Sequence, residues 1–153
     1  MTTSSVPAIK SYLFGTVLPT VYAGVTGVQI LYGPAGSHLD DDVVMVGDVR
    51  TSPEVTVMSP TRPYDERIDV TVVISCTRRG PDSATQQTAT EQAFNLLSLF
   101  RDYFKTRGNE ILGGACRESR VTSYDLVESA DPEVISNGRN AAITVTLSCI
   151  ARN

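Results

Sequence analysis

The residues best suited to chemistry form an acidic loop that holds the only histidine of the chain. His38 is followed by Asp40, Asp41 and Asp42. Hard carboxylate oxygens bind Mg²⁺ or Ca²⁺, so the cluster could hold a divalent cation. The glycine and distal glutamate of an EF-hand loop do not follow at the required offsets. The alternatives are a cation site and a solvated acidic loop, and we predict the solvated loop and no bound metal.

A cysteine next to a glycine turn is the second chemical candidate. Cys116 follows Gly113 and Gly114 and could be drawn as a nucleophile, but a reactive thiol needs an activating base, and His38 is the only histidine. A small cysteine-dependent enzyme is therefore a remote alternative. We expect no enzyme and no cofactor.

The number and spacing of the cysteines argue against a disulfide framework or a zinc site. The chain has three cysteines and no C-x-x-C pair. Cys76 and Cys149 lie in strand-like runs, where a free thiol behaves as a small buried hydrophobic residue.

Four arginines surround the ends of one predicted strand: Arg62, Arg67, Arg78 and Arg79. Such a group could contact nucleic acid or the acidic rim of a partner protein. The net charge of −4 and the pI near 4.9 argue against a protein that grips nucleic acid through its phosphates. No aromatic residues alternate with these arginines to stack on bases. The remaining alternatives are a solvated loop, which is the commoner case for such residues, and a contact with the acidic rim of a partner protein.

The elements that must position these residues centre on one strand and one helix. Residues 67–77 alternate apolar and polar side chains, which predicts a half-buried antiparallel strand. A long amphipathic helix follows, beginning near Asp82 or Ser83 and ending before Gly108. Its apolar stripe provides the main cover for the sheet, through Ala89, Ala93, Leu96, Leu97, Phe100, Tyr103 and Phe104.

The remaining patterns predict a second helix and further strands. Residues 4–18 read as a helix that Pro19 ends. Strands are expected at 26–32, 43–49, 54–58, within 117–128 and at 141–151, with Pro53 marking an edge or a break. The fold class is α+β: a mainly antiparallel sheet with an N-terminal helix and a long central helix packed on one face. We expect a single domain over residues 1–153.

The polar sides of the two best strands are rich in threonine and serine. They belong to residues 69–75 and 144–148. These faces are either an ordinary solvent surface or a surface that lines a ring or abuts a neighbour. The solvent surface is the simpler interpretation.

Composition places the chain among globular proteins. Hydrophobic residues make up 41% and charged residues 20%, which argues against disorder. No apolar run approaches the roughly 20 residues that span a bilayer. The first residues lack the basic start and apolar core of a signal peptide, so we expect synthesis in a cytoplasm and no membrane partner.

Three local patterns resemble the tail terminator (tail completion, minor tail) proteins of long-tailed bacteriophages. The first is the charged segment 65–67 that leads into the alternating strand, and the second is the helix with Ala93-Phe94-Asn95-Leu96-Leu97. The third is Asn137-Gly138-Arg139 leading into a Thr/Val strand near the C-terminus. The resemblance covers nearly the full length and also follows the order of elements.

The resemblance implies a structural role in the virion, at the interface between head and tail. Members of the family form a ring, usually a hexamer, that caps the tail tube and stops its growth. The ring also provides the surface that joins the head's connector. Partners would be other copies of the chain, the tail tube protein and the head–tail connector protein, with DNA only as passing cargo. Several negatively charged copies would repel that DNA. The alternatives are another connector or stopper protein, or a tube subunit.

Under this hypothesis the ring contacts come from loops and edges. Exposure and charge select eight residues as subunit or partner contacts: Asp40, Asp41, Asp42, Arg62, Arg67, Arg78, Arg79 and Arg139.

Overall fold

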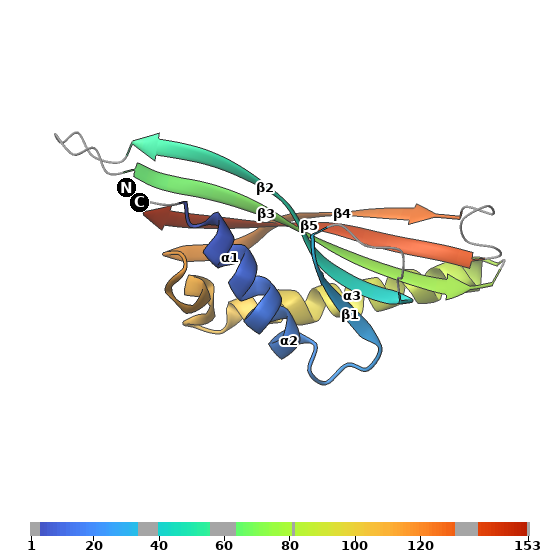
Figure 1. The fold of residues 1–153 in the computed structure, drawn as a ribbon. Coiled ribbons are helices and arrows are strands. Elements are labelled where there is room, and N and C mark those ends of the chain that lie inside the picture. The colour runs from blue at the N-terminus through green and yellow to red at the C-terminus, as the bar shows by residue number, and fades with distance from the viewer. Residues whose placement is uncertain (1–3, 34–39, 56–63, 81, 131–137, 153) are drawn as a thin grey trace.

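A computed structural model describes residues 4–33, 40–55, 64–80, 82–130 and 138–152. They form one sheet with all helices on one side (Figure 1). The helical elements are α1 (Val6–Tyr12), the π-helical turn η1 (Leu13–Val17), α2 (Leu18–Val21), α3 (Ser83–Lys105) and the 3-10 segment η2 (Asn109–Gly114). The strands are β1 (Val28–Tyr32), β2 (Asp42–Val55), β3 (Tyr64–Arg79), β4 (Glu118–Ser129) and β5 (Gly138–Arg152).

The sheet has the strand order β1-β2-β3-β5-β4. β3 lies at its centre and pairs antiparallel with both β2 and β5, and β4 pairs antiparallel with β5. β1 is the exception, because it pairs parallel with the first five residues of β2. The α+β prediction and the central position of the strand that contains residues 67–77 are thus confirmed, in a sheet that is mixed at one edge.

The core lies between the sheet and α3. The alternating residues of β3 from Ile68 to Cys76 and of β5 from Ala141 to Cys149 have no exposed surface. The α3 stripe meets them, with Phe100 fully buried. Asp82 caps this helix by accepting a hydrogen bond from the Thr85 backbone N–H at 3.0 Å, as its position predicted.

The N-terminal helix runs further than its sequence predicted. Pro19 was expected to end it, but α2 continues to Val21. The Leu18 backbone N–H donates to the Leu13 carbonyl, which makes a wider π turn. This turn shifts the hydrogen-bond ladder just where Pro19 has no N–H to donate, so the helical path continues past the proline.

Two predicted strands, 43–49 and 54–58, are one strand as far as Val55. β2 runs through Gly47-Asp48 and Pro53, and residues 56–58 lie outside the described residues. Pro53 lies in the part of β2 that has no partner strand on its outer side among the described residues, so it marks an edge and not a break. The register of β2 against β3 shifts between Val46 and Val49, a bulge that absorbs Gly47 and Asp48 without ending the strand. A Cβ on Gly47 would lie 3.3 Å from the Thr71 carbonyl oxygen, so the bulge brings the two backbones close together.

The segment η2 follows α3 and packs against the N-terminal helix α1. Leu112 is fully buried at φ 48°, a left-handed conformation that is uncommon for leucine. Gly113 follows at φ 65°, and a Cβ there would lie 2.5 Å from Cε2 of Tyr12. Glycine at this position lets the Tyr12 ring pack directly on the backbone.

Candidate assembly surfaces

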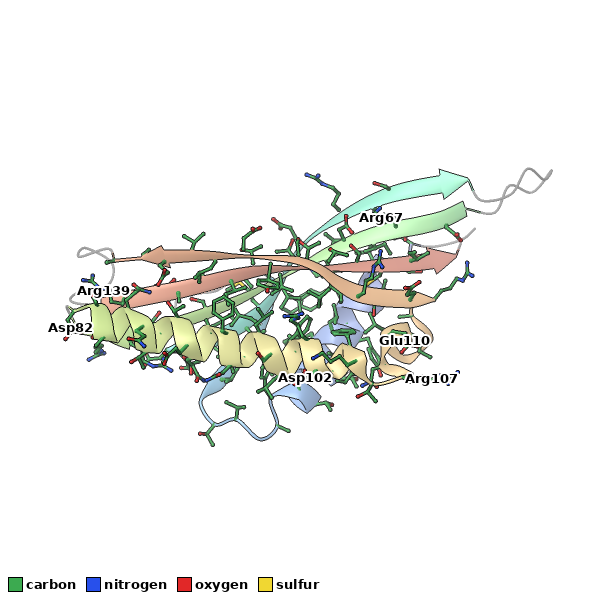
Figure 2. All side chains as sticks on the ribbon, turned by 180° about the vertical axis from the view of Figure 1, so that it is seen from behind. Arg67, Asp82, Asp102, Arg107, Glu110 and Arg139 are labelled. Atoms are coloured by element: carbon green, nitrogen blue, oxygen red, sulfur yellow. The ribbon has the colours of Figure 1, made fainter. Side chains whose placement is uncertain are left out.

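The residues predicted as contacts are distributed over both ends of the sheet. Asp40, Asp41, Arg67 and Arg79 are exposed, and Arg139 is half-buried. Arg62 and His38 lie outside the described residues. Figure 2 shows Arg67 on the side of the sheet away from α3, and Arg139 close to Asp82 at the opposite end. The arrangement gives several small charged areas instead of one patch.

Asp42 and Arg78 form an ion pair with each other. The two guanidinium nitrogens Nη1 and Nη2 of Arg78 donate to Oδ1 and Oδ2 of Asp42 at 2.6 and 3.1 Å. The Asp42 side chain is 10% exposed and the Arg78 side chain 28%. Donation of hydrogen bonds to the Asp42 carboxylate raises the pKa of Arg78, and burial opposes that shift. The pair joins the start of β2 to the end of β3.

This ion pair also affects a buried thiol. Burial, followed by the negative charge of Asp42, raises the pKa of Cys76 to about 12. The thiol has no exposed surface, in agreement with its predicted role as a small hydrophobic residue. Asp42 is buried although its neighbours Asp40 and Asp41 are exposed. An acidic run alone does not indicate which of its carboxylates is buried.

The charged segment at the start of β3 connects three parts of the fold. Glu66 accepts hydrogen bonds from the Ser4 hydroxyl at 2.9 Å and from the Ser5 backbone N–H at 3.2 Å. Asp65 forms an ion pair with Arg117 at 3.6 Å. Arg67 lies 3.8 Å from Asp69. A groove of about 280 Å³ opens beside them, lined by Asp65, Arg67, Glu118, Arg120, Ser148 and Ile150.

The open face of the sheet, away from the helices, is polar along its centre. Its side chains hydrogen-bond to one another: Ser148 donates to Asp69 at 2.6 Å, and the side-chain amide of Asn140 donates to Ser75 and Thr77, both at 2.9 Å. No buried side-chain nitrogen or oxygen in the described part of the chain lacks a partner. The face also carries exposed apolar side chains, Val127 and Ile150. No helix in the described residues covers it (Figure 1).

Both edges of the sheet leave backbone groups unpaired. β4 is the outer strand at one edge along its whole length. At the other edge β1 pairs with β2 only as far as Val46, so the length from Val49 to Val55 has no partner strand among the described residues. Unpaired strand edges are sites at which another chain can pair. The sequence did not show this property, because it depends on the order of strands in the sheet.

The cysteine considered as a nucleophile lies against another cysteine. The Cys116 side chain is hydrogen-bonded to Cys149, which lowers the pKa of Cys116 and raises the pKa of Cys149. The Cys116 thiol also donates to the Glu110 carbonyl at 3.5 Å. All three cysteines are free and buried. A base for Cys116 would have to be His38, which lies outside the described residues.

No group of three or more metal-ligating side chains occurs within the described ranges. No helix in those ranges combines the length and the apolar character needed to cross a bilayer.

Comparison with known proteins gives distant structural likenesses only. No protein family matches the sequence, and no curated protein matches it. The fold is similar to a chain in the virion of a native gene transfer agent particle, with a TM-score of 0.39 and 9% sequence identity. The match covers 94% of this chain and 92% of that chain. At this TM-score the likeness supports no statement about function.

Proposed function

We propose that this chain is a structural subunit of a phage-like particle, a tail terminator that forms a ring on the end of the tail tube. The observation that carries the proposal is a sheet with one face covered by helices, one open face and two unpaired edges. This architecture suits a subunit whose sheet pairs edge to edge with the sheets of neighbouring subunits. The resemblance of residues 65–67, 93–97 and 137–139 to tail terminators supplies the particular role.

Closure of a ring would pair the open strand edges and so prevent aggregation through them. A strand edge in a monomer can pair with any other exposed edge and lead to aggregation. In a ring of identical subunits, the β4 edge of each copy would face the β2 edge of the next. Such heterologous contacts close into a ring when the rotation between copies divides the circle evenly. A hexamer, as in the family that the sequence resembles, meets this condition.

The open face suits the wall of a channel through which DNA passes. Its serine and threonine side chains bond to neighbouring side chains. Its exposed arginines Arg50 and Arg67 lie opposite or beside Asp69, which offsets part of their positive charge. The net charge of −4 per chain would repel DNA that moves through the ring. In this role the chain is no enzyme and needs no cofactor. Its partners are the tail tube protein and the head–tail connector protein, and its place is the head–tail interface of the virion.

Electron microscopy of particles assembled with and without the protein tests this function. Over-long tubes and unjoined heads in its absence would support a terminator. Tails of normal length beside filled heads would instead indicate a connector or stopper protein. Unchanged infectious particles would refute a role in assembly.

A further inference from the structure

The two free edges of the sheet have matching directions. β4 runs antiparallel to β5, β5 to β3, and β3 to β2. β4 therefore runs antiparallel to β2 within one chain. A second copy that continues the sheet in the same orientation would bring its β2 edge against β4 as an antiparallel pair. Antiparallel strands pair through alternating hydrogen-bonded and non-hydrogen-bonded positions.

The backbone groups that point outward from β2 follow from this alternation. The Asp41 carbonyl accepts from the Thr77 backbone N–H, so the odd-numbered residues of β3 direct their backbone groups toward β2. After the bulge these residues face Arg50 and Ser52. The backbone groups of Val49 and Thr51 therefore point away from the sheet, toward the free edge.

The same alternation identifies the outward groups of β4. The even-numbered residues of β3 direct their backbone groups toward β5, so the even-numbered residues of β5 direct theirs toward β4. There, Thr144 and Thr146 face Asp125 and Ser123. The outward-pointing groups of β4 are consequently those of Tyr124 and Leu126.

Only registers that place outward groups against outward groups make hydrogen bonds, so the possible registers differ by two residues. One of them puts Leu126 opposite Val49, and therefore Asp125 opposite Arg50. Val49 and Leu126 are half-buried apolar side chains at the border of the core, each lacking a neighbouring strand on its outer side. Arg50 and Asp125 are both exposed and make no ion pair within the described part of the chain.

The neighbouring registers fit poorly. A slip of two residues in one direction sets Asp125 against Asp48, and like charges directly across a strand pair destabilise it. A slip in the other direction sets Glu128 against Val49 and Val127 against Arg50, so both the apolar and the ionic pair are lost. Arg50 faces Asp69 within its own chain, but Asp69 already accepts from Ser148 and lies near Arg67.

We propose that β4 of one copy pairs antiparallel with the free edge of β2 of a second copy, with Leu126 opposite Val49 and Asp125 opposite Arg50. The inference rests on the proposed ring and names the strands and residues that build it. In this register Asp125 and Arg50 occupy a non-hydrogen-bonded position, where Cα atoms are about 4.5 Å apart. That separation lies inside the range of a disulfide.

Engineered cysteines test the register directly. The double variant Arg50→Cys with Asp125→Cys should form a ladder of disulfide-linked multimers on a non-reducing gel of oxidised protein at assembly concentration. The matched control, Ser52→Cys with Asp125→Cys, places its cysteines on a diagonal about 7 Å apart and should give little cross-linking. Equal ladders for both pairs, or a ladder for the control alone, would overturn the register.

Charge exchange provides a second, non-covalent test. Arg50→Asp should weaken each subunit contact about fivefold, as expected for loss of an exposed ion pair, and Arg50→Asp with Asp125→Arg should restore it. Sedimentation velocity of the purified chain measures the association. Failure of the double variant to restore it would contradict the pairing, as would a chain that stays monomeric both alone and on isolated tails.

Cross-linking and electron microscopy together test the strand register and the terminator function separately. Rings seen by microscopy without the 50–125 cross-link would leave the ring and refute the register. Cross-linked rings in particles whose tail length does not depend on the protein would support the register and refute the terminator.

Discussion

Substitutions at the adjacent residues Arg78 and Arg79 should have different effects, because Arg78 stabilises the fold and Arg79 is exposed to a partner. Arg78 bonds the nearly buried Asp42 through two nitrogens, whereas Arg79 is exposed. Breaking a buried ion pair costs about 3–5 kcal/mol, and an exposed pair contributes up to about 1 kcal/mol. With side-chain exposures of 10% and 28%, the Asp42–Arg78 pair lies between these limits. We expect Arg78→Ala to lower the free energy of unfolding by about 2 kcal/mol.

Urea unfolding followed by circular dichroism measures this loss. For a slope of about 2 kcal/mol/M, the midpoint of Arg78→Ala should fall by about 1 M. Arg79→Ala should stay within about 0.5 kcal/mol of the parent, as exposed substitutions do. A double-mutant cycle with Asp42→Ala should show that most of the loss is coupling between the two side chains. Equal midpoints for the Arg78 and Arg79 variants, or no coupling, would refute the structural role of this pair.

The same contrast applies to assembly. Arg79→Glu should leave unfolding unchanged and reduce the joining of tails to heads, counted by electron microscopy, because its charge is available to a partner. Normal joining would remove Arg79 from the contact surface. Arg78→Glu is no test of contact, because it would place a second carboxylate beside Asp42.

Two further predictions concern the region around η2 and the thiols. Gly113→Ala should cost about 2–4 kcal/mol, because the residue is held at φ 65° and the new methyl group would meet the Tyr12 ring. Gly114→Ala, at φ 93° with open space around it, should cost only the backbone strain of about 1–2 kcal/mol, and equal losses in urea unfolding would contradict the packing argument. A thiol reagent at pH 8 should label Cys116 before Cys76 by peptide mass spectrometry, because burial raises the pKa of Cys76 to about 12 and the Cys149 thiol lowers the pKa of Cys116. Faster labelling of Cys76 would show that its strand opens before the segment after η2 does.

Periodic segments of the sequence predicted the elements that pack against the core. The alternation of residues 67–77 and the stripe of α3 each follow one period over several repeats, so the buried side could be read directly. The same reasoning correctly placed Cys76 and Cys149 inside. These features are local, because each strand or helix has to bury its own apolar side wherever it lies in the fold.

Features that depend on contacts between distant segments could not be predicted. The sequence places Asp42 in an acidic run, and only the pairing of β2 with β3 brings Arg78 to it. Pro19 normally ends a helix, and the π turn that accommodates it depends on packing of Leu13 and Val17 in the core. The parallel pairing of β1 with β2 likewise joins segments that no local pattern of the sequence relates. The periodic spacing of apolar residues therefore predicted buried positions better than charge predicted exposed positions.

The bulge in β2 affects both the fold of the monomer and the proposed contact between copies. Glycine and aspartate are poor strand formers, but Gly47 and Asp48 do not end β2. Instead they change the register of β2 against β3 at the point where β1 stops pairing. β2 thus supplies a partner edge to β1 before the bulge and a free edge after it. Because two residues of β2 lie opposite one residue of β3 in the bulge, Val46 and Val49 both face the core although they are three positions apart. The bulge therefore puts Val49, at the free edge, on the same side of the sheet as Leu126, which the proposed pairing of these two side chains requires.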